Sequence, residues 1–231
     1  MFKRDHHVRI AAVLQALDAD MLAELGCLFG GGTAIAFMRK EFRESFDIDF
    51  LVSSSTGYRA LREKITGEHS IQVLARRGAQ LSPVRDVRVD QYGIRTLVSV
   101  AGVDIKFEIV HEGRIVLAPP GPTDRVCGVA TLTLLDLLTT KLLANSDRWA
   151  DDSVFSRELI DLAMLEPTRP LLSSAIKKAT AAYGIAIQRD LDRAIRQLAE
   201  RTARLDECME ASKVEGVPKA LLWKRIRRLQ A

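Results

Sequence analysis

Two aspartates spaced two residues apart are the first feature of this sequence that could do chemistry. Asp47 and Asp49 lie in a stretch, residues 46–52, whose alternation with Phe46 and Ile48 predicts a β-strand. Side chains at such spacing point to one face of a strand, with Cα atoms about 6.6 Å apart. Neighbouring carboxylates repel each other, and a divalent cation relieves that repulsion. The pair therefore indicates a Mg²⁺ site, with Mn²⁺ as an alternative ion, unless this face simply meets water.

A third carboxylate is available if another predicted strand lies beside the first. Residues 95–100 and 103–110 are two β-rich runs joined by an Ala-Gly pair, which predicts a hairpin. Glu108 lies on the polar face of the second run, and Asp104 is an alternative on the same face. Three carboxylates from two strands could hold two Mg²⁺ ions about 3.5–4 Å apart, an arrangement that catalyses phosphoryl transfer.

A glycine-rich turn precedes the aspartates. Gly30, Gly31, Gly32 and Thr33 come directly before a predicted helix over residues 33–39, of which Thr33 is the expected N-cap. Backbone N–H groups, the positive end of a helix dipole and a hydroxyl group suit a triphosphate. The ordinary interpretation is a tight turn that needs glycine, and the run does not end in the Gly-Lys-Ser/Thr of a P-loop.

The elements that must position these residues form two different halves. Up to about residue 120, the strands alternate with predicted helices such as residues 10–17 and 59–65, and a Pro-Pro-Gly-Pro stretch then interrupts the chain. The predicted fold class is α+β, with a mixed β-sheet flanked by helices over residues 1–120 and an all-α bundle over residues 121–231. The helices expected in the second half are residues 132–144, 152–165, 170–183 with Gly184 as C-cap, 188–211 and 219–229.

Composition places the chain among globular proteins. Its 231 residues are 47% hydrophobic and 28% charged, so the apolar surface suffices for a core and disorder is not expected. No run approaches the roughly 18 apolar residues of a membrane span, and no signal-peptide core follows the N-terminus. Three widely spaced cysteines predict neither a disulfide framework nor a zinc site. We therefore expect a cytoplasmic protein without a membrane partner.

The two ends of the sequence carry most of the remaining polar signals. The net charge of +4 is a weak sign of nucleic-acid binding, but a segment near the C-terminus has five basic residues and no acid. They are Lys219, Lys224, Arg225, Arg227 and Arg228. Either this segment is a solvated helix or it contacts phosphates. His6 and His7 are expected to be disordered N-terminal residues, since no metal-ligand spacing links the histidines.

Two motifs taken together are more specific than any of their parts. Residues 29–37 read Phe-Gly-Gly-Gly-Thr-Ala-Ile-Ala-Phe, and residues 43–50 read Arg-Glu-Ser-Phe-Asp-Ile-Asp-Phe. Farther on, Lys141 lies in a leucine-rich helix, and residues 157–162 read Arg-Glu-Leu-Ile-Asp-Leu. This pattern resembles the AbiEii/AbiGii-type toxin family of the DNA-polymerase-β-like nucleotidyltransferases, in which the last motif is Arg-Asp-x-x-Asp-Leu. The resemblance covers roughly residues 20–165.

The resemblance implies an enzyme that moves a nucleoside monophosphate from an NTP to an acceptor. Asp47, Asp49 and Glu108 would bind Mg²⁺, Lys141 would contact a phosphate, and Asp161 would orient Lys141 or an arginine, or act near the acceptor. The residues that would hold the triphosphate are Gly31, Gly32, Thr33 and Ser45, with Arg43 assisting.

The resemblance also implies partners. Some members of this family are toxins that modify the 3′ end of tRNA and are countered by an antitoxin, so we expect an NTP, a tRNA or other RNA acceptor, and a cognate antitoxin. Two other functions stay open at this point. The same site would serve nucleotidylation of a protein or a small molecule, and the chain could be a non-catalytic module that binds an NTP or a partner.

Overall fold

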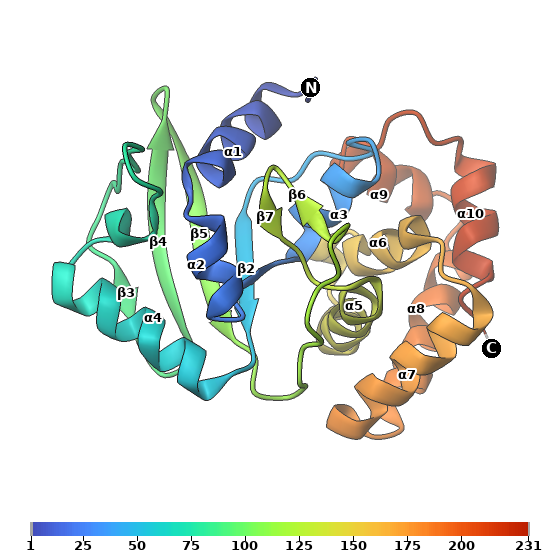
Figure 1. Cartoon of the computed structure of the whole chain (residues 1–231). Coiled ribbons are helices and arrows are strands. Elements are labelled where there is room, and N and C mark those ends of the chain that lie inside the picture. Colours follow the sequence, from blue (N-terminus) through green and yellow to red (C-terminus); the bar gives the residue numbers. More distant parts are fainter. Residues whose placement is uncertain (1, 231) are drawn as a thin grey trace. The chain divides into compact units, whose positions relative to one another are not determined.

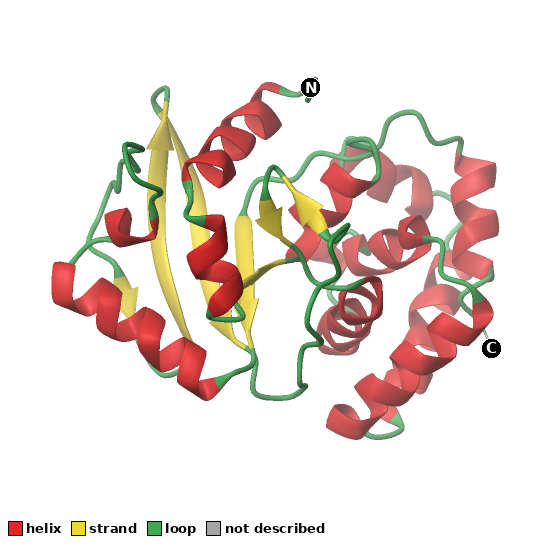
Figure 2. Ribbon diagram, viewed as in Figure 1, coloured by secondary structure: helices red, strands yellow, loops and turns green. Residues whose placement is uncertain are grey.

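The computed structural model describes residues 2–230, and its contacts group the chain into two compact units. The sheet unit contains the residues up to Ala34 together with Ser45–Thr133. The helical unit contains Ile35–Glu44 and the residues from Leu134 onward. Figure 1 follows both units along the chain by colour, and Figure 2 marks their helices and strands. Together they make the α+β fold that the sequence predicts.

The sheet unit is built on five strands in the order β1-β2-β5-β4-β3. The strands β2 and β5 run parallel, whereas every other neighbouring pair in this sheet is antiparallel. The predicted hairpin is confirmed as the antiparallel pair β4 and β5. The strand bounds are β1 Leu28–Phe29, β2 Ile48–Val52, β3 Arg88–Val89, β4 Gly93–Val100 and β5 Val103–His111, and β6 Arg125–Val126 with β7 Val129–Ala130 forms a separate ribbon.

The alternation of side chains between the two faces of the sheet places one face of β2 and of β5 in the core. Ile48 and Phe50 of β2 are fully buried, as are Phe107 and Ile109 of β5, while the residues between them face the other side of the sheet. The predicted strand begins two residues too early, however. Pairing with β5 starts at Ile48, and residues 45–47 pair with no strand, so that Phe46 is 51% exposed.

The helices of the sheet unit correct two further predictions. His6 and His7 are not disordered, because they lie in α1 and His7 is completely buried. Thr33 is not an N-cap, because α3 already begins at Gly31. The helices are α1 Asp5–Ala16, α2 Ala19–Glu24, α3 Gly31–Met38, which ends in the helical unit, α4 Ser55–Glu68 and the 3₁₀ turn Ile71–Leu74.

Within the described residues, six α-helices follow Thr133, whereas residues 121–133, which the sequence pattern assigns to the all-α bundle, belong to the sheet unit and contain β6 and β7. The six helices are α5 Leu134–Arg148, α6 Arg157–Leu165, α7 Arg169–Tyr183, α8 Ala186–Glu200, α9 Arg204–Ala211 and α10 Lys219–Arg227. Gly184 is the C-cap of α7, as predicted, with a φ of +63°. Among the described residues, no helix combines the length and the apolar character needed to cross a bilayer.

Two predicted long helices are each broken. The segment 188–211 divides into α8 and α9, because Arg201 takes an extended conformation and its guanidinium binds Asp152 at 2.8 Å. The segment 152–165 divides because Phe155 and Ser156 both adopt positive φ, which leaves a 3₁₀ turn before α6. Neither break contains glycine or proline, so local sequence signals do not predict it.

Candidate active site

Asp49 and Glu108 are direct neighbours in the sheet. Asp49 of β2 is the register partner of Glu108 in the parallel strand β5, which confirms that the hairpin lies beside the aspartate strand. Asp104 pairs instead with Ser99 of β4 and is exposed, and β2 does not extend to it. Register therefore selects Glu108 over Asp104 as the third carboxylate of this face.

Two cations occupy Glu108. Arg95 Nε donates to its Oε1 and Lys106 Nζ to its Oε2, both at 2.6 Å. Burial alone would raise the pKa of Glu108, but these two partners outweigh it and the net pKa is lowered. Burial lowers the pKa of Lys106, and the charges of Glu108, Asp49 and Asp47 more than offset that effect. Lys106 is thus the counter-charge of all three carboxylates.

The three carboxylates do not form a preassembled metal cage. Within residues 2–230, no group of three or more His, Cys, Asp and Glu side chains is arranged to hold a metal ion. Both oxygen atoms of Glu108 are engaged with cations instead. Lys106 also interacts electrostatically with Asp47 and Asp49.

The glycine turn packs directly on the carboxylate of Asp49. Gly31 has a φ of +67°, and a Cβ atom there would lie 2.5 Å from Oδ2 of Asp49. The backbone N–H of Gly30 donates to the Asp49 carbonyl oxygen at 2.8 Å. The turn therefore needs glycine at position 31 both for its conformation and for the close approach to Asp49.

Thr33 and Ser45 join the glycine turn to Asp47. The Thr33 hydroxyl donates to the Asp47 carbonyl oxygen at 2.5 Å and hydrogen-bonds the Ser45 hydroxyl at 2.8 Å. Both side chains are buried. In the structure these hydroxyl groups, which the glycine turn and the family resemblance offer for a triphosphate, bind each other and the carbonyl oxygen of Asp47.

The helical unit contains a second cluster of predicted residues. Arg43 forms a bidentate salt bridge with Asp161, in which Nε donates to Oδ1 at 2.7 Å and Nη2 donates to Oδ2 at 2.8 Å. Lys141 Nζ lies 2.6 Å from Oε2 of Glu158 and 2.7 Å from Oδ2 of Asp161. All four side chains are buried, and Asp161 has no exposed surface. The contact between Asp161 and Lys141 that the resemblance implies is thus present.

Electrostatics keep this cluster charged despite its burial. Burial would raise the pKa of Asp161, but the charges and hydrogen bonds of Arg43 and Lys141 lower it below its ordinary value. Burial would lower the pKa of Lys141, but Asp161 and Glu158 raise it. Glu158, which replaces the aspartate of the family motif, keeps a carboxylate on Lys141.

Arg43, which the resemblance assigns to the triphosphate, is the arginine that Asp161 contacts. Besides its two bonds to Asp161, its Nη1 donates to the carbonyl oxygen of Glu44 at 2.8 Å. All three nitrogen atoms of the guanidinium are therefore used inside the helical unit. Local sequence gives no sign of this pairing, because Asp161 lies 118 residues farther along the chain.

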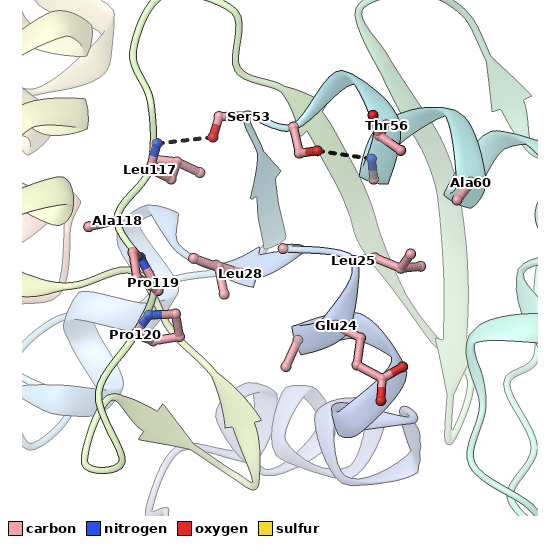
Figure 3. Close-up of a pocket in the computed structure, with 14 residues that line it drawn as sticks. Glu24, Leu25, Leu28, Ser53, Thr56, Ala60, Leu117, Ala118, Pro119 and Pro120 are labelled. Carbon is pink, nitrogen blue, oxygen red and sulfur yellow. Dashed lines mark hydrogen bonds between the residues drawn. The ribbon is translucent and has the colours of Figure 1, made fainter.

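A cavity of about 410 Å³ lies elsewhere in the sheet unit (Figure 3). Its walls are the end of α2, the start of α4 and the strap formed by residues 117–120, and most of its lining is apolar. Ser53, which follows β2, anchors the strap by accepting a hydrogen bond from the backbone N–H of Leu117 at 3.0 Å. None of the predicted site residues lines this cavity.

The mixed sheet, the paired acidic residues of its polar face and the glycine turn against them are together typical of a nucleotidyltransferase. A comparison of sequences agrees: residues 13–228 match the family described as "Nucleotidyl transferase AbiEii toxin, Type IV TA system". The chain belongs to this family of nucleotidyltransferase toxins. Membership implies a nucleotide substrate and an antitoxin partner.

Two solved structures from Helicobacter pylori are similar to the whole chain. One, provisionally described as a nucleotidyltransferase, is 16% identical with a TM-score of 0.46, and the match covers 98% of this chain and 97% of that one. The other, JHP933, is 14% identical with a TM-score of 0.49, and the match covers 99% and 93%. A search of curated proteins finds no significant match.

Proposed function

We propose that this protein transfers a nucleoside monophosphate from an NTP to the 3′ end of a tRNA in a Mg²⁺-dependent reaction, and that it acts as a toxin countered by an antitoxin. The observation that carries the proposal is the contact between the glycine turn and the acidic segment. Gly31, which would face the triphosphate, lies against Asp49, which would bind the metal. A triphosphate and its metal ion need such neighbouring sites.

The residues present fit a magnesium ion. Mg²⁺ prefers oxygen ligands and is commonly held by one or two carboxylates, with substrate phosphates and water completing its shell. Asp47 and Asp49 supply two carboxylates, and Glu108 would join them once Lys106 gives up one of its oxygen atoms. When bound, Mg²⁺ neutralises the charge that develops on the phosphate groups.

The chain's own residues have distinct tasks in this reaction. An acceptor hydroxyl forms a bond to the α-phosphorus, the bond to the β-phosphate oxygen breaks, and pyrophosphate and a proton leave. The N–H groups of Gly31 and Gly32 at the start of α3 are suited to bind the triphosphate. We assign a phosphate contact to Lys141, whose positive charge is maintained by Asp161 and Glu158.

The basic helix α10 supports an RNA acceptor. Of the five cations in α10 and its C-cap Arg228, two are paired within the helical unit, since Lys219 binds Asp206 and Arg225 binds Glu166. The other three make no ion pair within the described part of the chain; they are Lys224, Arg227 and Arg228. Three such cations would add a salt-dependent term to RNA binding.

One gel tests the proposal. The protein is incubated with Mg²⁺, total RNA and each of the four α-³²P-labelled NTPs in turn, and the products are separated with and without protease treatment. We expect label in the tRNA band, from one NTP more than the others. Label that migrates with protein instead would indicate protein nucleotidylation. Label in neither the RNA nor the protein would contradict nucleotidyl transfer to either acceptor.

A further inference from the structure

Two consecutive histidines of α1 bind the short segment directly before Asp47. The backbone N–H of Ser45 donates to Nε2 of His7 at 3.1 Å. Nε2 of His6 lies 3.0 Å from the carbonyl oxygen of Phe46. The rings of His6 and Phe46 are also in contact, with 4.9 Å between their centroids. Every one of these residues lies in the sheet unit.

The two histidines must play opposite hydrogen-bonding roles. A backbone N–H can only donate, so Nε2 of His7 accepts and carries no proton, which places the ring proton on Nδ1. A carbonyl oxygen can only accept, so Nε2 of His6 carries a proton and donates. His7 is completely buried whereas His6 is only half-buried, and an unsatisfied group costs more the more deeply it is buried.

The segment needs these side chains because the sheet does not hold it. Residues 45–47 precede β2 and have no strand partner, so ladder hydrogen bonds do not fix them. Their polar groups are bound by side chains instead: Ser45 N–H by His7, the Phe46 carbonyl by His6, and the Asp47 carbonyl by Thr33. Side chains of α1 and α3 therefore fix the backbone of residues 45–47, and with it the position of Asp47.

We propose that His7 is a positioning residue of the nucleotide site, which holds Ser45 and through it Asp47 in the geometry that binds the metal and the triphosphate. The inference rests on the proposed function, because it assigns His7 a task in that site. His7 touches neither substrate nor metal; it acts through the backbone of Ser45. An ordinary core histidine on α1 would affect stability alone.

A matched pair of variants tests this role. The variants His7→Gln and His7→Met introduce side chains of similar length and size. Only the glutamine side chain supplies an oxygen acceptor near the position that Nε2 of His7 occupies. We expect His7→Met to raise the KM for the NTP about tenfold or more, since the buried Ser45 N–H loses its acceptor. His7→Gln should recover most of that loss. Val13→Ala, a buried change on the same helix, should lower stability and leave KM unchanged.

A second readout does not depend on activity. Hydrogen–deuterium exchange of peptides that contain residues 45–47 should be faster in His7→Met than in the wild type, and nearly normal in His7→Gln. Equal KM values and equal exchange in the two variants would overturn the role of His7. A wild-type protein that transfers no label from any NTP would contradict the proposed function instead, and the exchange experiment would still decide whether His7 orders this segment.

Discussion

Gly31 lies so close to Asp49 that a single added methyl group would sit 2.5 Å from the Oδ2 atom and 2.9 Å from the Cβ atom of the aspartate. These distances are far inside van der Waals contact. The glycine run therefore does more than turn the chain, because it brings the start of α3 against the carboxylate to which we assign the metal. The first prediction tests this contact.

Gly31→Ala should abolish nucleotidyl transfer and lower stability. The change imposes about 1–2 kcal/mol of backbone strain at positive φ, and the clash with Asp49 adds to it. Gly26→Ala is the matched control, because Gly26 has a φ of +66° and nothing within 4 Å of the added methyl group. Chemical denaturation and the transfer assay compare the two. If both variants lose equal stability and activity, the contact with Asp49 has no special importance.

Lys106→Met should tighten Mg²⁺ binding. Lys106 neutralises Glu108 and acts on Asp47 and Asp49, so a metal ion must compete with it. Because Lys106 is 46% exposed, the effect should be modest, about 0.5–1 kcal/mol or two- to fivefold in affinity. Titration calorimetry with Mg²⁺ measures it, and exposed Lys64→Met serves as the control. Weaker binding in Lys106→Met would show that the lysine assists the site.

Asp161→Asn should unfold or strongly destabilise the protein, by about 3–5 kcal/mol, because it leaves two buried cations without their shared partner. Asp206→Asn removes an exposed pair with Lys219 and should cost less than about 1 kcal/mol. Urea denaturation of the three proteins gives the comparison. Similar midpoints for both variants would contradict the central place of Asp161 in the helical unit.

The same cluster predicts a pH dependence. The pKa of Asp161 is lowered in the folded state from its ordinary 3.8, so its stabilising contribution is complete above that pH. As the pH falls through the lower folded pKa, the carboxylate is protonated and the contribution is lost. The stability difference between wild type and Asp161→Asn should therefore be constant near neutrality and shrink below about pH 4. A difference that grows in acid would contradict this assignment.

Replacing Lys224, Arg227 and Arg228 by glutamine should weaken RNA binding and reduce its salt dependence. Each phosphate contact that is lost should lower the slope of log K against log salt by somewhat less than one. The paired cation Lys219 is the control, because Asp206 already neutralises it. Filter binding of tRNA at several salt concentrations gives the slope. An unchanged slope would mean that α10 does not touch the acceptor.

The sequence predicts the centre of the fold well, because the relevant signals are local. Alternation along residues 103–110 places Ile105, Phe107 and Ile109 in the core, and all three are fully buried. The alternation around Asp49 holds from Ile48 onward but fails at Phe46, since a period of two cannot show where strand pairing begins. The break between α8 and α9 is not predicted either, because Arg201 takes an extended conformation there without a glycine or proline to signal it.

The sequence predicts which residues the candidate site contains better than it predicts the contacts between them. Composition and spacing point to Asp47, Asp49 and Glu108, and the parallel pairing places the last two side by side. Two other relationships depend on tertiary structure alone: the pairing of Arg43 with Asp161 and the burial of His7 against Ser45. In both, the partners are too far apart in sequence for a periodicity to link them.

The most direct test of the metal centre compares two aspartates of one sheet in the labelled-NTP assay. Asp49→Asn removes the carboxylate that lies against Gly31, whereas Asp104→Asn changes an exposed aspartate that pairs with β4. We predict that wild type and Asp104→Asn transfer label to RNA only when Mg²⁺ is present, and that Asp49→Asn, although folded, transfers none. Mg²⁺-dependent transfer at a normal rate by Asp49→Asn would contradict the account.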